Sequence, residues 1–134
     1  MLYRGGNLEV RLGGRTFHCA LDVTMAFVGG KWKTVVLWYL RDKPLRFGEL
    51  RRRIPEITEK MLSLQLKKLE RDGLVLRKAY AEVPPRVEYA LTAEGKTLRP
   101  LLSALAAWGR RKGKKDGTIV KGPAGRGPKK IPSP

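Results

Sequence analysis

The sequence has little cysteine and little histidine, with one residue of each among its 134 residues. A lone cysteine excludes a disulfide bond within the chain, and Cys19 with the neighbouring His18 supplies too few ligands for a zinc site. We therefore expect no metal site and no cofactor. The longest uninterrupted apolar run extends from Val35 to Leu40, whereas a membrane-spanning helix needs about 20 residues. The N-terminus also lacks the apolar core of a signal peptide, so the sequence predicts a cytoplasmic protein without a membrane partner.

Acidic residues are scarce as well. The chain has 12 Asp and Glu against 29 Lys and Arg, which gives a formal net charge of +17 at pH 7. Such an excess favours polyanionic partners, of which nucleic acid is the first. The sequence shows no set of nucleophile and base, no paired carboxylates and no glycine-rich phosphate loop, so we expect that the protein is not an enzyme. Its length fits a single domain.

Apolar and polar residues alternate in the segment LEVRLGGRTF, residues 8–17, on both sides of Gly13-Gly14. Glycine tolerates the positive φ of tight turns, so this pattern predicts a short N-terminal β-hairpin. We assign residues 1–18 to an N-terminal extension that contains the hairpin. Two amphipathic helices should follow, over 19–28 and 31–40, because their apolar residues recur at intervals of three and four.

The next segment has the pattern of a helix-turn-helix motif. The run FGELRRRI, 47–54, predicts a short helix that ends at Pro55. Thr58 is a suitable N-cap for a longer helix that extends to Asp72. The buried side of this longer helix is expected to be Leu62, Leu66 and Leu69. A short helix, a tight turn and a longer helix with a basic outer face are typical of DNA-binding proteins.

Two strands should follow, roughly over 75–82 and 86–91, with Pro84-Pro85 between them. Proline cannot donate a hydrogen bond to a neighbouring strand, so it suits the tip of a hairpin, outside the paired region. A rigid tip would hold Arg86 as an arm for contact with a nucleic acid. Helix, helix-turn-helix, two-stranded hairpin and helix, in this order, predict a winged helix, an α+β fold that is mainly helical.

Thr92 is the expected N-cap of a final helix, and Pro100 should bend that helix or make it irregular near its start. Its apolar side consists of Leu98, Leu101, Leu102, Leu105 and Trp108. A terminal helix has few partners inside so small a domain, so we favour a dimer contact over an intramolecular core for this side. The sequence from Arg110 onward is rich in Gly, Pro and Lys. We therefore assign 19–112 to the winged-helix domain and 113–134 to a disordered basic tail.

Several motifs occur in order along the chain. They are Cys19, GGKW at 29–32, LRFGEL at 45–50, ITEKMLSLQLKKLERDGLVLR at 57–77, VPPRVEYALTAEG at 83–95 and Trp108-Gly109. With these motifs the chain resembles the HxlR-type winged-helix transcription regulators, relatives of the MarR group. The resemblance implies a homodimeric, sequence-specific regulator that binds double-stranded DNA. It further implies that Thr58–Asp72 is the recognition helix, that Val75–Leu91 is the wing, and that the first and last helices form the dimer interface.

The candidate site residues fall into four groups. In the recognition helix they are Thr58, Glu59, Lys60, Ser63, Leu64, Lys67, Lys68 and Arg71. In the wing they are Lys78, Pro84, Pro85 and Arg86, and elsewhere on the DNA-binding side they are Arg46, Arg51 and Arg52. The candidate dimer residues are Leu21, Met25, Leu101, Leu105 and Trp108.

Other interpretations stay open at this point. The basic helix face could be an ordinary solvated surface. The high charge and the Lys/Gly/Pro-rich end would also suit a non-specific nucleic-acid-coating or chromatin-architectural protein, and a winged helix can bind RNA or another protein. Cys19 occupies the position at which the resemblance implies a thiol sensor of oxidants or electrophiles in some members. The alternative is a small residue buried in the dimer contact, and the sequence identifies no effector.

Overall fold

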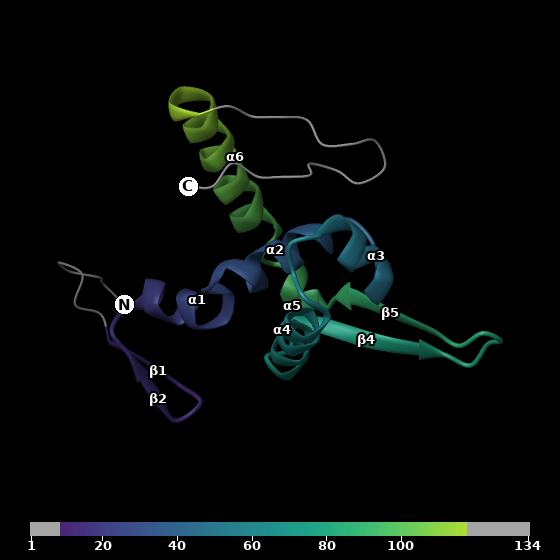
Figure 1. Ribbon diagram of the computed structural model, residues 1–134. Coiled ribbons are helices and arrows are strands. Elements are labelled where there is room, and N and C mark those ends of the chain that lie inside the picture. Colours follow the sequence, from purple (N-terminus) through teal and green to yellow (C-terminus); the bar gives the residue numbers. More distant parts are fainter. Residues whose placement is uncertain (1–8, 118–134) are drawn as a thin grey trace.

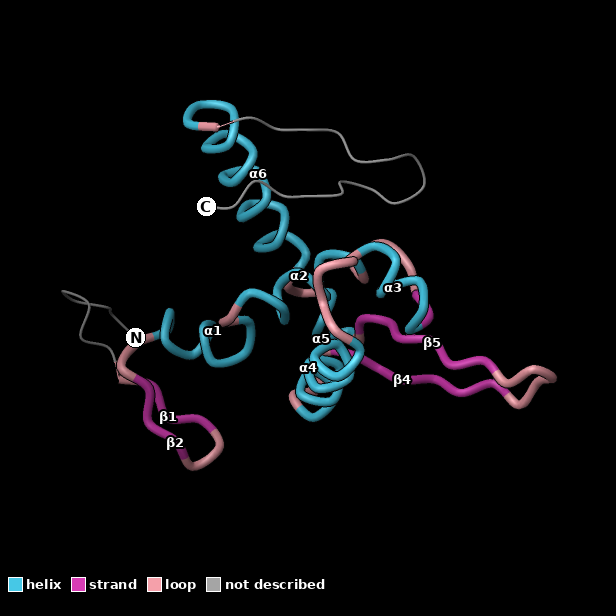
Figure 2. The backbone as a smooth tube through the Cα atoms, viewed as in Figure 1, coloured by secondary structure: helices cyan, strands magenta, loops and turns pink. Residues whose placement is uncertain are grey.

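Helices form most of the fold, and a small antiparallel sheet extends from one side of them (Figures 1 and 2). The computed structural model describes residues 9–117. In chain order the elements are β1 (Val10–Leu12), β2 (Arg15–Phe17), α1 (Ala20–Val28), α2 (Lys31–Tyr39), β3 (Leu45–Arg46), α3 (Phe47–Arg53), α4 (Glu59–Arg71), β4 (Val75–Tyr80), β5 (Arg86–Leu91), α5 (Ala93–Lys96) and α6 (Arg99–Asp116). The architecture is the α+β, mainly helical winged helix that the sequence predicted.

The core lies between α2, α3 and α4. Val36 and Leu37 of α2, Leu50 of α3 and Leu62 of α4 are fully buried. The spacing of these apolar residues places one side of each helix toward the others, and burial of each large side chain contributes about 1.5–3 kcal/mol. The predicted buried side of α4 is confirmed, since Leu66 and Leu69 are buried as well.

The turn between α3 and α4 is anchored from both ends. Ile54 and Ile57 are each only 2% exposed, so both ends of the turn are held against the core by a buried side chain. The hydroxyl of Thr58 then accepts a hydrogen bond of 3.0 Å from the backbone N–H of Met61. This contact satisfies one of the free N–H groups at the start of α4 and confirms Thr58 as its N-cap.

The wing belongs to a three-stranded sheet with the order β3-β5-β4. The sequence predicted only the hairpin of β4 and β5, because the two residues of β3 are too few to show an alternating pattern. Leu45 of β3 pairs with Tyr89, and Arg46 pairs with Glu88. This third strand connects the start of α3 to the wing through strand pairing. β4 ends at Tyr80, two residues earlier than expected.

The C-terminal part differs from the expected single bent helix. Thr92 caps the short helix α5, because its hydroxyl accepts a hydrogen bond of 2.9 Å from the backbone N–H of Gly95. A separate helix, α6, begins at Arg99 with Pro100 in its first turn. The expectation of a single helix was wrong, whereas the irregularity expected near Pro100 is present as the break between α5 and α6. Proline fits the first turn of the second helix, where its missing N–H has no partner to lose.

Helix α6 also continues further than the sequence suggested. It extends to Asp116, so residues 113–116 are helical and the predicted start of the tail at 113 is wrong. Arg and Lys are good helix formers, and positive side chains are favourable in the last turn of a helix. These effects outweigh the low helix propensity of Gly113. The rest of the predicted tail, 118–134, lies outside the described residues.

The predicted N-terminal hairpin is confirmed. β1 and β2 pair antiparallel, and the turn between them uses Gly13 at φ 57° and Gly14 at φ 77°. Two successive residues with positive φ match the favoured two-residue hairpin turn. Phe17 is buried, and α1 follows with Cys19 as its N-cap residue. Within residues 9–117, no helix combines the length and apolar character needed to cross a bilayer.

Candidate nucleic-acid interface

Helix α4 presents a basic side to solvent, opposite its buried leucines. Lys60, Lys67 and Arg71 are exposed, and Leu64 between them is 44% exposed. Ser63 and Lys68 flank this side and are half-buried. The structure therefore brings the predicted recognition-helix residues onto one surface, which carries three exposed cations and one exposed apolar side chain.

The start of α4 is tied to α3 by charge. Arg51 Nη1 lies 3.8 Å from the Glu59 carboxylate, and the Glu59 side chain is 72% exposed. An exposed pair of this kind contributes at most about 1 kcal/mol. Its consequence for the site is that Arg51 is already partnered, whereas Arg46 and Arg52 face solvent without a carboxylate partner among residues 9–117.

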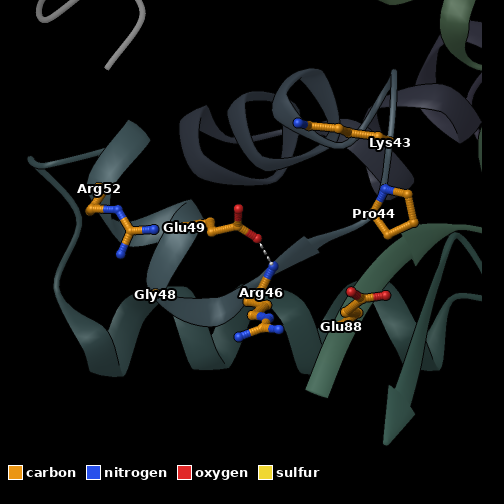
Figure 3. A pocket seen from close by; sticks show the side chains of 7 residues that line it. All are labelled: Lys43, Pro44, Arg46, Gly48, Glu49, Arg52 and Glu88. Carbon is orange, nitrogen blue, oxygen red and sulfur yellow. Dashed lines mark hydrogen bonds between the residues drawn. The ribbon is translucent and has the colours of Figure 1, made fainter. Parts of the chain in front are cut away.

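Arg46 and Arg52 meet in a shallow pocket of about 560 Å³ between α3 and the wing. The pocket is lined by Lys43, Pro44, Arg46, Gly48, Glu49, Arg52 and Glu88 (Figure 3). The carboxylate of Glu49 accepts a hydrogen bond of 2.8 Å from the backbone N–H of Arg46, which fixes the first turn of α3. Lys43 was not among the predicted residues. The only signal for Lys43 in the sequence was its place beside Pro44, shortly before the start of the helix-turn-helix motif.

One side of the wing collects charged residues from all three strands. The register places Lys78 of β4 and Arg46 of β3 opposite the same residue of β5, Glu88. Residues directly opposite on neighbouring strands have their side chains on the same side of the sheet. Glu88 therefore lies between two cations, and the surface keeps an excess of positive charge.

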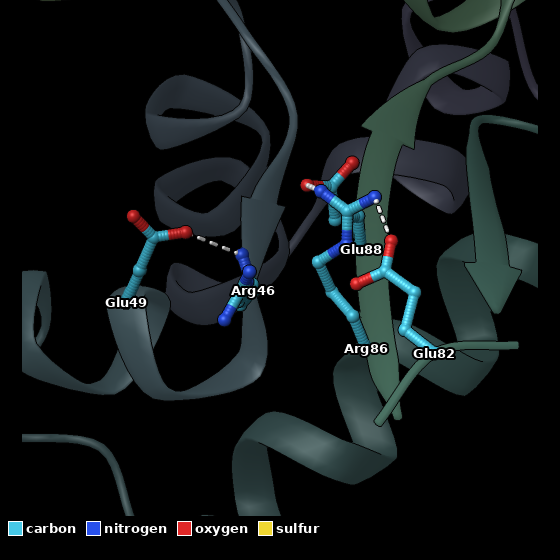
Figure 4. Close-up of polar contacts among 5 residues, drawn as sticks. All are labelled: Arg46, Glu49, Glu82, Arg86 and Glu88. Atoms are coloured by element: carbon cyan, nitrogen blue, oxygen red, sulfur yellow. Dashed lines mark hydrogen bonds and ion pairs between the residues drawn. The ribbon is translucent and has the colours of Figure 1, made fainter. Parts of the chain in front are cut away.

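Arg86 does not project from the tip of the wing as the sequence suggested. Its guanidinium lies 2.9 Å from the carboxylate of Glu82 and 3.2 Å from that of Glu88 (Figure 4). It also lies 3.9 Å from the centre of the Tyr80 ring. Because Tyr80 stands directly opposite Arg86 in the register, the side chain folds back along the strands. The guanidinium therefore does not extend from the tip as an arm, and the contact of Arg86 with a nucleic acid stays a prediction. Pro84 and Pro85 at the tip are exposed.

Apolar side chains of α1 and α6 are left uncovered by the single chain. Leu21 is 67% exposed and Met25 is 51% exposed on α1, while Leu105 is 48% and Trp108 58% exposed on α6. Leu101 is half-buried, and no described residue of α6 beyond Leu102 is buried. Both helices extend away from the body (Figure 1). All five predicted dimer residues thus lie on α1 and α6, and four of the five are exposed in the single chain.

Cys19 is half-buried at the start of α1. Its backbone carbonyl begins the helix by accepting from the N–H of Val23 at 3.2 Å. The carboxylate of Asp22 accepts a hydrogen bond of 2.9 Å from the N–H of His18. Within residues 9–117, no group of three or more His, Cys, Asp or Glu side chains could hold a metal ion.

Comparisons with known proteins agree with this geometry. The family model for HxlR-like helix-turn-helix proteins matches residues 27–116. An HTH-type transcriptional regulator of Methanothermobacter thermautotrophicus is 49% identical over 102 residues, which cover 76% of this chain and 78% of the relative. The HTH-type transcriptional regulator YkvN of Bacillus subtilis is 50% identical over 95 residues, which cover 71% of this chain and 80% of YkvN. The structure of the redox regulator HypR in its oxidized form superposes with a TM-score of 0.67 at 45% identity, over 69% of this chain and 96% of HypR.

Proposed function

Because the chain belongs to the HxlR-like helix-turn-helix family of transcriptional regulators, we propose that two copies of it together bind one specific sequence of double-stranded DNA. The observation that carries this proposal is the exposed basic side of α4. The major groove admits one α-helix and displays a different set of donors and acceptors for each base pair. A helix with an apolar side fixed to the core and a basic side facing outward fits that groove.

The stretch of α4 from Lys60 to Lys67 is the part that reads bases. The helix has 13 residues and is therefore about 20 Å long, so only part of it reaches the floor of the groove. Lys60 and Lys67 are long enough to donate to guanine, and Leu64 offers an apolar contact to a thymine methyl group. Lys68 and Arg71, nearer the other end, are placed for the phosphate backbone.

The pocket between α3 and the wing serves as a backbone contact. Arg46, Arg52 and Lys43 bring three cations to it against the two carboxylates of Glu49 and Glu88. Lys78 continues the positive surface along the wing. Phosphate contacts fix the register of a protein on the duplex and carry no sequence information themselves. In this arrangement α4 selects the sequence, while α3 and the wing hold α4 in place.

The dimer forms through α1 and α6. The exposed Leu21, Met25, Leu105 and Trp108 would each bury apolar surface against a second copy, at about 25 cal/mol per Å². A symmetric pair of winged helices reads two half-sites, so the dimer makes twice the contacts of a single chain.

The test is a selection of bound sites from random duplex DNA, followed by affinity measurements on the selected site and on a scrambled one. We expect a ratio of about 10³ or more between the two. A nucleic-acid-coating or architectural protein would give a ratio near one. A preference for single-stranded or double-stranded RNA over the selected duplex would favour the RNA-binding alternative.

Two matched variants test α4 as the reader. Lys60→Gln with Lys67→Gln removes two charges from its exposed side. Lys96→Gln with Arg99→Gln removes two charges from exposed positions on α5 and α6. A lost base contact costs about 1–3 kcal/mol and relaxes the preference at one position. We expect this change only for the α4 pair. Equal losses of affinity in both double variants would mean that α4 contributes only general positive charge and does not read the sequence.

Cys19 gives the regulator a route to respond to oxidants. Its place at the start of a proposed dimer helix means that a modified thiol would disturb the interface. Since the chain has a single cysteine, reversible oxidation can yield a sulfenic acid, a mixed disulfide or a disulfide between chains. We expect hydrogen peroxide to lower operator affinity in the unaltered protein, dithiothreitol to restore it, and Cys19→Ser to abolish the response. A response that persists in Cys19→Ser would leave Cys19 as a packing residue only.

A further inference from the structure

The end of α6 carries a cluster of positive charge that the reading surface does not use. Its members are Arg110, Arg111 and Lys114, all exposed. None of the three has a carboxylate partner within residues 9–117, where the ion pair at this end joins Lys112 to Asp116. Asp116 is also the only acidic residue after Glu94 in the whole sequence. The cluster therefore cannot be neutralised by neighbouring side chains along the chain.

The cluster lies on a different side of α6 from the proposed dimer contact. An α-helix turns by about 100° per residue. On this spacing Leu101, Leu105 and Trp108 fall within one narrow sector of α6. Arg110 and Lys114 fall nearly opposite that sector, and Arg111 falls well outside it. A second copy packed on the leucines and Trp108 would leave the three cations in solvent.

The cluster is also far from the DNA that α4 would bind. Helix α2 contacts both α4 and α6, and in Figure 1 α4 and the free part of α6 lie on opposite sides of it. In Figure 1, α6 leaves the body away from α4 and ends at the far edge of the molecule. From Leu102, its last buried residue, to Lys114 the helix advances by about 18 Å.

Dimerisation does not bring the cluster back toward the operator. The two-fold axis of a dimer on a pseudo-palindromic site passes through the duplex at a right angle to it. Rotation about an axis leaves the height of every atom along that axis unchanged. The partner's copy of α6 therefore ends at the same height above the duplex, and six cations of a dimer lie on its outer side. This step rests on the proposed function.

We propose that the ends of α6 form a second DNA-binding surface, so that one dimer on its operator holds a second segment of duplex DNA. The cluster offers only positive charge, without an apolar pocket or a carboxylate to select a particular partner. That chemistry suits the phosphate backbone, which is bound without regard to sequence. DNA flanking an operator is present near the bound dimer at high effective concentration. The second segment is thus recognised by charge alone, and the operator by α4.

The experiment attaches the selected operator duplex to beads at low density, saturates it with the full-length protein and washes away free protein. A fluorescent duplex of unrelated sequence is then added at 50 mM salt. The unaltered protein should retain the second duplex. Retention should fall by about 10³-fold when the salt is raised from 50 to 200 mM, because six phosphate contacts give a salt slope of about −5.

The test variant is Arg110→Gln, Arg111→Gln and Lys114→Gln together, and glutamine preserves helix propensity. The matched control removes three exposed charges elsewhere, by Arg11→Gln, Arg15→Gln and Lys96→Gln. We expect the test variant to lose at least about ten-fold in retention, with operator affinity, dimer mass and helical circular dichroism unchanged. The control should retain the second duplex.

Two results would overturn the proposal. One is an unaltered, operator-bound protein that captures no second duplex, which would leave the cluster as a solvated helix end or the site of another acidic partner. The other is equal retention by the test variant and the unaltered protein, which would place capture elsewhere in the chain. Failure to bind the operator in the first step is a separate outcome, because it would contradict the proposed function.

Discussion

Arg86 illustrates how a single residue can match a sequence expectation in position and differ from it in role. It lies at the base of the wing tip, as expected, but its guanidinium contacts two carboxylates and one aromatic ring. Only 26% of its side chain is exposed. To reach a phosphate, the guanidinium would have to break its ion pairs with Glu82 and Glu88. The two unpaired carboxylates would then repel the phosphate backbone of the DNA. The contacts therefore favour a role in neutralising and positioning the wing.

The first prediction separates these roles. Arg86→Ala should weaken binding to operator and scrambled duplex alike, by about 1 kcal/mol, because it adds one net negative charge near the phosphates. Adding Glu82→Gln and Glu88→Gln to that variant should restore binding, since the repelling charges are then gone. Affinities by fluorescence anisotropy at one salt concentration are sufficient. A triple variant as weak as Arg86→Ala would show that the guanidinium contacts DNA itself.

Gly95 is a second position where one residue decides the local structure. A Cβ atom at this place would lie 2.2 Å from the carbonyl oxygen of Leu74 and 3.3 Å from Cβ of Leu91. The close approach lets α5 cross the chain just after α4, where the hydroxyl of Thr92 donates to the carbonyl of Gly73 at 2.6 Å. No side chain larger than hydrogen fits without moving the backbone.

The second prediction follows from this contact. Gly95→Ala should lower the free energy of unfolding by about 3 kcal/mol, in the range of overpacked cores, as measured by urea denaturation. Gly48→Ala is the matched control. It lies in α3, and its new Cβ would meet only the end of the Arg52 side chain at 3.7 Å, so its stability should be unchanged or slightly higher. A Gly95→Ala protein as stable as the unaltered one would mean that α5 shifts freely.

Most elements of the fold could be predicted from the sequence, because each carries its own local pattern. α4 has a capping threonine, a leucine every three or four residues and a glycine at its end, and all three act within one helix. The turn of the N-terminal hairpin is likewise decided by two glycines. The elements that escaped prediction depend on partners distant in sequence. β3 exists only because β5 pairs with it, and the position of Arg86 depends on Tyr80 across the hairpin.

The same distinction holds for the candidate site. The exposed side of α4 follows from helical spacing, so its residues could be named from the sequence. The pocket could not, since it joins Lys43 and Arg52 with Glu88, which lies more than thirty positions further along the chain. The length of α6 was misjudged for another reason. Its glycines suggested disorder, but the high helix propensity of the Arg and Lys residues between them keeps the segment helical.

The third prediction concerns α6 as an element. Leu105→Asp places a charge in the apolar side of α6 and should produce a monomer that keeps its helical content. Operator affinity should fall by about 10²-fold or more, because the second half-site no longer adds to the first. Ala107→Asp introduces the same charge at an exposed position on the other side of α6 and should stay dimeric. Sedimentation velocity at micromolar concentration distinguishes the two. An unaltered chain that sediments as a monomer would end the dimer hypothesis.

At the scale of the whole molecule, charge and shape have separate tasks. In the proposed function, the net charge of +17 would raise affinity for any duplex and make it depend steeply on salt. It cannot select a sequence. Selection needs groups held at fixed positions, and the buried leucines of α4, the capped turn before it and the strand pairing of the wing supply them. In the proposed dimer, symmetry would multiply that selection, since two identical surfaces would be presented at one fixed separation.

The last prediction is about that separation. Selected sites should be pseudo-palindromic, with half-sites whose centres lie about one helical turn apart, 34–36 Å, or a multiple of it. Inserting about five base pairs between the half-sites turns the second one to the opposite face of the duplex, where a rigid dimer cannot reach it. Affinity should then fall to the value for an isolated half-site. The monomeric Leu105→Asp protein should bind the original and the lengthened site equally well, since it reads only one half. Unchanged affinity of the unaltered protein for the lengthened site would mean that its two copies bind independently, and the role given to α1 and α6 would have to be abandoned.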